Sequence, residues 1–220
     1  MTPSILPLKM PPLENGDQLT RYEFEQRYAA MPHVKKAELI EGFVYMASPL
    51  HAKAHAEPHA HIIGWLVAYK AATPGVQLLD NATVRLDSDN EVQPDALLRI
   101  ETNGQSVISE DDYVEGAPEL IVEIAASSAS IDLSQKFNAY RRNQVQEYLV
   151  WRVYDREFDW FCLRQGKYIP LQPNATGFLC SAVFPGLWLA KSALLSEDIA
   201  TVLAVLQQGL ATPEHQSFNR

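Results

Sequence analysis

The sequence contains few cysteines and no long apolar run. Cys162 and Cys180 are too few and too far apart for a zinc knuckle or a disulfide framework, so we interpret them as small apolar side chains of a reducing compartment. No apolar stretch approaches the roughly 18 residues of a membrane span. The N-terminus also lacks the apolar region of a signal peptide. These absences predict a cytoplasmic protein without a membrane partner.

Positive charge is scarce as well. There are 18 lysines and arginines against 27 aspartates and glutamates, and the formal net charge is −9. A protein that held duplex DNA by charge alone would usually be basic. The balance argues against strong non-specific DNA binding, but not against a local cleft in which acidic residues hold a metal. The acidic run over residues 109–116 is interpreted as a solvated loop.

The length and composition fit one folded unit. A chain of 220 residues with 47% hydrophobic content is long enough for one sizeable core. We expect a single domain over residues 19–210. A flexible, proline-rich arm over residues 1–18 precedes it, and a C-terminal tail over residues 211–220 follows it.

Hydrophobic periodicity predicts helices that alternate with strands. Helical spacing covers residues 19–31, 58–72, 131–143 and 196–210, with Ser130 and Ser196 as expected N-caps. Strand patterns cover residues 37–48, 76–86, 94–100, 119–125 and 147–154, and a hairpin covers residues 157–172. This order predicts a mixed β-sheet flanked by helices, of class α/β or α+β. A right-handed crossover should place the strands at 119–125 and 147–154 side by side.

Two carboxylates occupy strand positions at which exposure to solvent is not expected. Asp95 starts a strand after Pro94, and Glu123 lies inside the most apolar strand. A buried, ionised carboxylate needs a cation or a dense set of donors. Two such groups on neighbouring strands could share Mg²⁺, which prefers oxygen ligands and activates water against a phosphodiester. The alternative is that Asp95 caps a turn and Glu123 pairs with an arginine.

The strand of Glu123 is typical of a metal-dependent nuclease, except that it lacks the usual lysine two residues later. That position is Ala125. Lys136, in the following predicted helix, shares one helix face with Asp132 and Tyr140 and could reach Glu123 if the helix packs over the strand. The alternative is a surface pair of Asp132 and Lys136, worth about 0.3–0.5 kcal/mol. An ammonium more than about 8 Å from the carboxylates would argue against catalysis.

Several stretches resemble the Uma-two family of restriction-endonuclease-like proteins, a branch of the PD-(D/E)xK nuclease superfamily. The matching segments are "ELIEG" (38–42), "PHAHIIGWL" (58–66), "VRL" (84–86), "QPDALL" (93–98), "GAPELIVEIAASSASIDLSQKFNAYRRNQVQEYLVWRV" (116–153) and "FPGLWL" (184–189). The long segment is the specific one. The resemblance covers roughly residues 19–195 and implies a restriction-endonuclease-like fold.

The resemblance also implies a metal site. Asp95 and Glu123 correspond to the family's two acidic metal ligands, and the main-chain carbonyl of Ile124 corresponds to a further ligand. Glu38 corresponds to a glutamate near the active site. The expected cofactor is Mg²⁺, with Mn²⁺ as a substitute.

The family commonly carries its lysine on the helix after the strand, in a "D…K…Y" pattern. In this chain the pattern is Asp132, Lys136 and Tyr140, which makes Lys136 the expected catalytic lysine and the other two candidate substrate-binding residues. The implied activity is hydrolysis of phosphodiester bonds to leave a 5′-phosphate, by a homodimer, with DNA as the expected substrate and RNA as the alternative. The competing hypothesis is a catalytically inactive nuclease fold that binds nucleic acid or a protein.

Histidines form the last notable cluster. His51, His55 and His59 have the spacing i, i+4, i+8, which on a continuous helix could bind zinc or nickel. Pro58 argues against a continuous helix through this stretch. We expect instead that His55 or His59 lines the cleft and contacts phosphate. The family match favours His59 as a substrate-binding residue, and a metalloenzyme centred on the histidines remains the third hypothesis.

Overall fold

Helices and strands alternate along the chain, as the periodicity predicts. The computed structural model describes residues 10–46, 51–126 and 128–218. Within these ranges the strands form two six-stranded sheets and one two-stranded sheet. Both large sheets are mixed, because each contains one parallel pair among antiparallel neighbours. The predicted mixed α+β architecture is therefore confirmed.

We call the larger layer the central sheet. Its strands, in spatial order, are β12 (Lys167–Pro170), β11 (Glu157–Arg164), β10 (Glu147–Arg152), β9 (Leu120–Ala125), β6 (Ala96–Ile100) and β3 (Val76–Asp80). β9 and β10 pair in parallel, so the two strands predicted to lie side by side do so. The hairpin turn falls at Gln165 and Gly166, both with positive φ, as expected.

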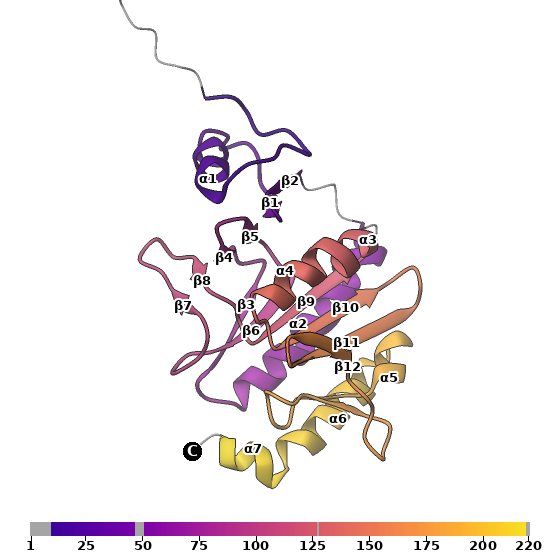
Figure 1. The fold of residues 1–220 in the computed structure, drawn as a ribbon. Coiled ribbons are helices and arrows are strands. Elements are labelled where there is room, and N and C mark those ends of the chain that lie inside the picture. The colour runs from indigo at the N-terminus through magenta and orange to yellow at the C-terminus, as the bar shows by residue number, and fades with distance from the viewer. Residues whose placement is uncertain (1–9, 47–50, 127, 219–220) are drawn as a thin grey trace, which may run out of the picture.

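The second layer, the outer sheet, lies toward the N-terminal end of the fold (Figure 1). Its strands, in spatial order, are β2 (Phe43–Met46), β1 (Ala37–Ile40), β5 (Asn90–Val92), β4 (Val84–Asp87), β8 (Val114–Glu115) and β7 (Val107–Ile108). β13 (Leu179–Cys180) and β14 (Trp188–Leu189) form the small sheet.

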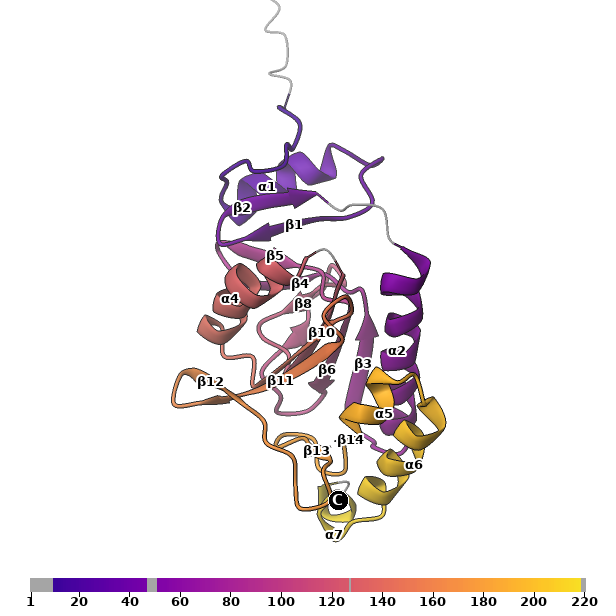
Figure 2. The same cartoon turned by 90° about the vertical axis from the view of Figure 1, so that its right-hand side faces the viewer.

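Helical segments cover both faces of the central sheet. The helical segments of the described chain are α1 (Arg21–Ala29), which packs on the outer sheet, and η1 (Ala52–Ala56), α2 (Glu57–Ala71), α3 (Ala129–Ile131), η2 (Asp132–Lys136), α4 (Phe137–Arg142), α5 (Lys191–Leu195), α6 (Ile199–Leu210) and α7 (Pro213–Phe218). Figure 2 shows α4 on one side of the strands and α2, α5 and α6 on the other. η1 and η2 are π-helical turns that run directly into α2 and α4.

This covering explains the composition of the central strands. All six residues of β9 are buried, as expected for a strand packed on both faces. On one face, α2 contributes Ile62, Trp65, Leu66 and Tyr69 to a large apolar cluster, at the i, i+3, i+4, i+7 spacing of one helix stripe. On the other face, Tyr140 packs into a second cluster between the two sheets.

Two predicted helix caps are wrong. Ser130 lies inside α3, whose N-cap position is Ser128. Ser196 ends α5, and its N–H bonds back to the carbonyl of Ser192. The N-cap of α6 is Asp198, whose side chain accepts a hydrogen bond from the N–H of Thr201 at 3.0 Å. In both cases the serine predicted to cap the start of a helix belongs instead to a short helix that precedes it.

The two ends of the chain contribute to the packing. Leu13 is buried within the stretch predicted as an arm, and residues 1–9 lie outside the described residues. The predicted tail contains α7, whose His215 is buried and contacts Thr73 at 3.0 Å. Residues 219–220, and residues 47–48 of the predicted second strand, also lie outside the described part. In that part, no helix combines the length and the apolar character that crossing a membrane requires.

Candidate active site

Two neighbouring strands bring Asp95 and Glu123 together. Ala96 pairs with Val122 in the antiparallel ladder of β6 and β9, so the next position of the register places Asp95 opposite Glu123. Residues that face each other in such a ladder point to the same side of the sheet. Both side chains are buried, with 5% and 3% of their surface exposed. The two predicted metal ligands therefore share one site.

Asp95 is held by donors on both carboxylate oxygens. Its Oδ2 accepts a hydrogen bond from the N–H of Ile124 at 2.7 Å, and its Oδ1 lies 3.2 Å from Nε2 of His55. Burial raises the pKa of Asp95, but the hydrogen bond and charge of His55, with Lys36 and the Ile124 N–H, lower that pKa below its ordinary value. Asp95 is thus an ionised carboxylate at neutral pH, as a metal ligand must be.

Lys136 reaches Glu123 from the following helix. Its Nζ donates to Oε1 of Glu123 at 2.9 Å. This distance is far shorter than the roughly 8 Å beyond which the ammonium could not act in catalysis with the carboxylates. Lys136 and Asp132 are buried, with 5% and 1% of their surface exposed, and Nζ lies 3.9 Å from Oδ1 of Asp132. The alternative of an ordinary surface pair is therefore wrong.

Glu38 approaches the same ammonium from β1. Its Oε1 lies 3.0 Å from Nζ of Lys136 and accepts the N–H of Gln93 at 2.8 Å. The main chain two residues before Asp95 thus positions Glu38. Burial lowers the pKa of Lys136, but the charges of Glu123, Glu38 and Asp132 raise it well above its ordinary value. The ammonium stays charged at the centre of three carboxylates.

Hydroxyl groups complete the cluster. Tyr140 donates to Oε1 of Glu123 at 2.7 Å, and Ser128 donates to Oδ2 of Asp132 at 2.6 Å. Tyr148, from β10, donates to the main-chain carbonyl of Asp132 at 3.0 Å and packs edge-on against Tyr140. The predicted "D…K…Y" residues therefore lie in one buried network, with Asp132 and Tyr140 turned inward.

The network carries more negative than positive charge. Burial, and then the charges of Asp132, Asp95 and Glu38, raise the pKa of Glu123 to about 8, although Lys136 opposes this shift. Lys136 and Tyr140 both donate to Oε1 of Glu123. A divalent cation would supply the missing charge and would favour the ionised form of Glu123. The donors present are oxygens, which are the ligands that Mg²⁺ prefers.

The protein donors for such an ion are few. No group of three His, Cys, Asp or Glu side chains in the described part of the chain is arranged to hold a metal. A magnesium site here would consist of Asp95, Glu123 and a main-chain carbonyl such as that of Ile124, completed by water. Mg²⁺ commonly keeps several waters and binds through one or two carboxylates, so the residues fit this ion.

The histidines enter the site through a continuous helix. The π-helical turn η1 runs directly into α2, and Pro58 sits in the first turn of α2. The prediction that Pro58 interrupts the helix is therefore wrong, because η1 and α2 follow each other without a break. His55 contacts the Asp95 carboxylate, while Nε2 of His59 lies 3.0 Å from the Asp95 carbonyl and 3.1 Å from Oδ1 of Asp80.

Both histidines predicted to line the cleft lie at Asp95, and the role of His59 in binding substrate stays a prediction. His59 holds the main chain of Asp95, whereas His55 touches its carboxylate. His51 is exposed, and the described histidines do not form a three-ligand metal set. The hypothesis of a metal centre on the histidines has no support from the described residues.

Some residues of the site carry no sequence signal. Lys36 donates to the Gln93 carbonyl at 2.8 Å and lowers the pKa of Asp95, but it stands in a segment without periodicity. Tyr148 is one of several apolar residues of a buried strand, so its hydroxyl contact with Asp132 could not be foreseen. The only signal for His55 was its position one turn before His59.

Comparison with known proteins identifies the family and the fold. The family described as "Uma2: Putative restriction endonuclease" matches residues 21–192. Among solved structures, this chain is similar to "a putative nuclease belonging to DUF820 from Anabaena variabilis ATCC 29413", with a TM-score of 0.54 and 13% identity. The alignment covers 82% of this chain and 97% of that chain. The similarity shows a restriction-endonuclease-like fold, as the sequence predicts. No curated protein matches the chain.

Proposed function

Because the chain belongs to the Uma2 family of putative restriction endonucleases, we propose that it is a metal-dependent nuclease that hydrolyses phosphodiester bonds of DNA. The observation that carries the proposal is the ammonium of Lys136, 2.9 Å from Oε1 of Glu123. The buried Lys136 contacts Glu123, and Asp95 lies at the start of the neighbouring strand, so these groups would provide both parts of a hydrolytic site. One part holds a cation, and the other contacts the attacking water or the phosphate.

Asp95, Glu123 and the carbonyl of Ile124 are the proposed ligands of Mg²⁺ or Mn²⁺. The bound ion would supply Lewis-acid stabilisation of charge on the phosphate. The hydrogen bond from the Ile124 N–H fixes the Asp95 carboxylate, so this ligand needs little reorganisation when the ion arrives. His55 holds the other oxygen of Asp95 and orients it.

Lys136 is the proposed contact to the reacting groups. An ammonium has three N–H donors; one bonds Glu123, and Glu38 forms an ion pair at 3.0 Å. The remaining donor can orient a water or a phosphate oxygen. In the reaction, the water oxygen forms a bond to phosphorus and Glu38 accepts the water proton. The bond from phosphorus to the 3′ oxygen breaks, and the 3′ oxygen takes a proton from solvent water. The products are a 5′-phosphate and a 3′-hydroxyl.

The experiment is cleavage of supercoiled plasmid and of single-stranded DNA with Mg²⁺ or Mn²⁺. Asp95→Asn keeps the shape of the side chain and removes its charge, and we expect activity to fall at least about 100-fold. Glu38→Gln should lower the rate with little change in metal dependence. Asp112→Asn is the matched control, because Asp112 is exposed in a loop and Asn tolerates its positive φ.

Three outcomes separate the hypotheses. Loss of cleavage in Asp95→Asn, with normal folding and an unaffected Asp112→Asn, supports the proposal. Cleavage that survives Asp95→Asn places the chemistry elsewhere. No cleavage by the wild type of DNA or RNA with either metal would favour the non-catalytic alternative. We further propose a cytoplasmic homodimer, which light scattering of the purified protein tests.

A further inference from the structure

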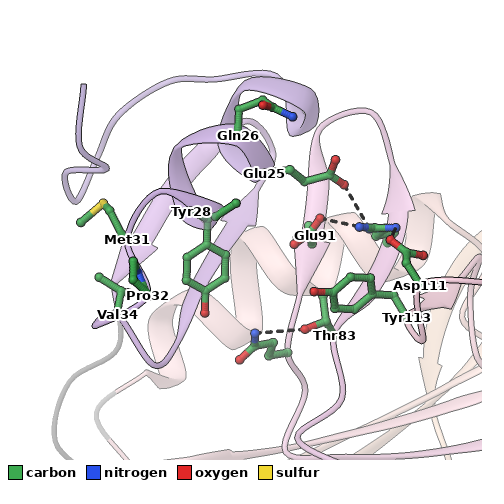
Figure 3. Close-up of a pocket in the computed structure, with 13 residues that line it drawn as sticks. Glu25, Gln26, Tyr28, Met31, Pro32, Val34, Thr83, Glu91, Asp111 and Tyr113 are labelled. Atoms are coloured by element: carbon green, nitrogen blue, oxygen red, sulfur yellow. Dashed lines mark hydrogen bonds and ion pairs between the residues drawn. The ribbon is translucent and has the colours of Figure 1, made fainter. Parts of the chain in front are cut away.

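A pocket lies on the face of the outer sheet that carries α1. It has a volume of about 610 Å³, within the range of pockets that hold small organic molecules. Figure 3 shows α1 and the segment after it on one side, and the strands of the outer sheet on the other. The pocket residues are Glu25, Gln26, Tyr28, Ala29, Met31, Pro32, Val34, Thr83, Arg85, Glu91, Gln93, Asp111 and Tyr113.

The walls of the pocket are aromatic and apolar. Tyr28, Met31 and Val34 come from α1 and the segment after it, and Tyr113 comes from the loop between β7 and β8 (Figure 3). The ring of Tyr113 is anchored, because the guanidinium of Arg85 lies 4.2 Å from its centroid. Such walls suit the hydrocarbon or aromatic part of a ligand.

The floor of the pocket is acidic. Arg85 is the one cationic residue among the described residues that line it, against the carboxylates of Glu25, Glu91 and Asp111. The Arg85 guanidinium lies 3.0 Å from Glu25, 3.5 Å from Glu91 and 2.9 Å from Asp111. One guanidinium group thus forms ion pairs with three carboxylates in the pocket.

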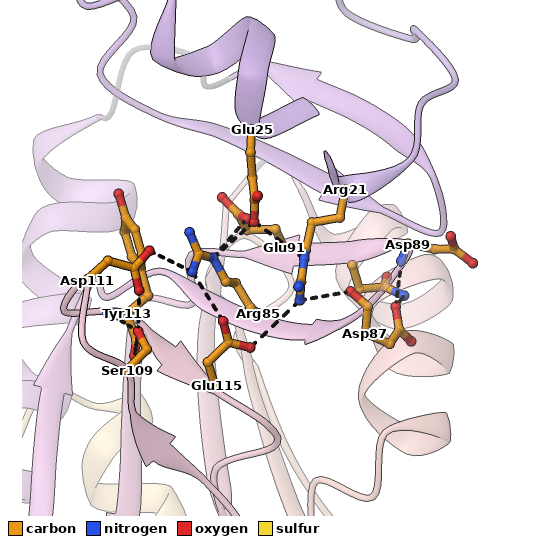
Figure 4. Close-up of polar contacts among 11 residues, drawn as sticks. Arg21, Glu25, Arg85, Asp87, Asp89, Glu91, Ser109, Asp111, Tyr113 and Glu115 are labelled. Atoms are coloured by element: carbon orange, nitrogen blue, oxygen red, sulfur yellow. Dashed lines mark hydrogen bonds and ion pairs between the residues drawn. The ribbon is translucent and has the colours of Figure 1, made fainter. Parts of the chain in front are cut away.

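Residues just outside the pocket do not neutralise its excess of negative charge. Arg85 also lies 3.1 Å from Glu115, and Arg21 lies 3.4 Å from Glu25 and 3.7 Å from Glu115 (Figure 4). Together these contacts join four carboxylates, Glu25, Glu91, Asp111 and Glu115, to two guanidinium groups. With all groups ionised, the cluster keeps an excess of two negative charges.

Glu91 is the carboxylate on which the excess of negative charge has the clearest effect. Its side chain lines the pocket although only 6% of the residue is exposed, and its buried Oε2 has no hydrogen-bond partner in the described chain. Its contact to Arg85 is an ion pair at 3.5 Å without hydrogen-bond geometry. Burial, and then the neighbouring carboxylate of Glu25, raise the pKa of Glu91 to about 7. A buried carboxylate of this kind is incompletely satisfied by the protein.

We propose that this pocket binds an organic cation, an ammonium or guanidinium group on an apolar stem. Glu25 and Glu91 face the positive charge, and Tyr28 and Tyr113 flank the stem. A carboxylate pair with aromatic neighbours matches both parts of such a ligand. Phosphate-bearing ligands are excluded by the same negative charge, which would repel them. The proposal does not depend on nuclease activity.

The test compares two probes of the same shape on the full chain. N-butylguanidinium carries the charge, and N-butylurea is its neutral counterpart. Isothermal titration calorimetry should show saturable binding of the cation in the millimolar range, and at least about tenfold weaker binding of the urea. Because this comparison uses the wild type alone, it stands even if a variant fails to fold.

Variants then locate the binding. Glu91→Gln and Glu25→Gln should each weaken binding of the cation at least about tenfold. Glu110→Gln is the matched control, since Glu110 is an exposed acid in the adjoining loop that does not line the pocket, and it should bind as the wild type does. Equal affinity for the two probes, no saturation up to about 20 mM, or unchanged binding in both pocket variants would overturn the proposal.

Two sources of such a cation can be separated. Spermidine represents a free polyamine, and acetyl-Gly-Arg-Gly-amide represents an arginine side chain of a partner protein. Tighter binding of spermidine than of butylguanidinium assigns the pocket to free amines. Tighter binding of the peptide assigns it to a protein partner, and replacing its arginine by citrulline should then abolish binding.

Discussion

Replacing Lys136 by methionine should destabilise the fold far more than loss of a surface lysine. Methionine keeps most of the volume of the stem and removes the charge. It would leave Glu38, Glu123 and Asp132 without the ammonium that lies 3.0, 2.9 and 3.9 Å from them. Breaking a buried ion pair by removing one partner costs about 3–5 kcal/mol. An exposed i,i+4 pair would cost only about 0.3–0.5 kcal/mol.

The cost should depend on pH in a defined direction. In the wild type the pKa of Lys136 is raised, so its contribution is fully present from pH 5 to pH 8. In the variant Glu123 and Asp132 lose a neighbouring cation, and their pKa values, which are already raised in the folded state, rise further. The folded chain then holds more protons than the unfolded chain as pH increases, so the free energy of unfolding falls.

Urea unfolding at pH 5 and pH 8 measures this effect. We expect a loss of about 3–5 kcal/mol at pH 8, equivalent to roughly 6–20 °C in Tm for a chain of this size, and a smaller loss at pH 5. Lys70→Met is the control, because Lys70 is exposed on α2. A loss below about 1 kcal/mol, or an equal loss at both pH values, would refute the account of a buried, charge-compensating lysine.

Three further predictions concern single groups. Tyr140→Phe removes the 2.7 Å hydrogen bond to Glu123 and should lower the free energy of unfolding by about 1–3 kcal/mol in urea titrations; unchanged stability would mean that the bond contributes nothing. Mg²⁺ at about ten times its Kd should stabilise the EDTA-treated wild type by about 1.4 kcal/mol in thermal unfolding, and an equal gain in Asp95→Asn would remove Asp95 from the ligand set. Burial and the neighbouring Glu25 raise the pKa of Glu91 to about 7, so ionisation opposes folding above its ordinary pKa. Glu91→Gln should therefore gain about 1–2 kcal/mol relative to the wild type between pH 5 and pH 8; no relative gain would place Glu91 in a less buried setting.

The sequence raised the hypothesis of the site from two carboxylates, Glu123 in an apolar strand and Asp95 at the start of another strand. Strand patterns do not say which strands are neighbours, so a turn cap and an arginine pair stayed open, and the family resemblance assigned both residues as metal ligands. The spacing of Asp132, Lys136 and Tyr140 also predicted a shared helix face. It could not decide whether that face points to water, since the same spacing describes exposed pairs.

Other features depend on contacts between distant segments. The pocket beside α1 combines Glu25, Arg85, Glu91 and Asp111, and no local period links these positions. The run over residues 109–116, interpreted as a solvated loop, supplies Asp111 and Glu115 to Arg85. His55, which contacts the Asp95 carboxylate, lies in a π-helical turn, which composition does not predict.

Both helices that deliver residues to the candidate site enter it through a π-helical turn, η1 over Ala52–Ala56 and η2 over Asp132–Lys136. Such a turn holds one residue more than the α-helical ladder requires, and these turns are frequent at functional sites. Each can therefore be regarded as a one-residue insertion into an α-helix. Deleting one residue from η2 would rotate Asp132 relative to Tyr140 by about 100°. We expect that relatives can vary in the sequence of these turns more freely than in their length.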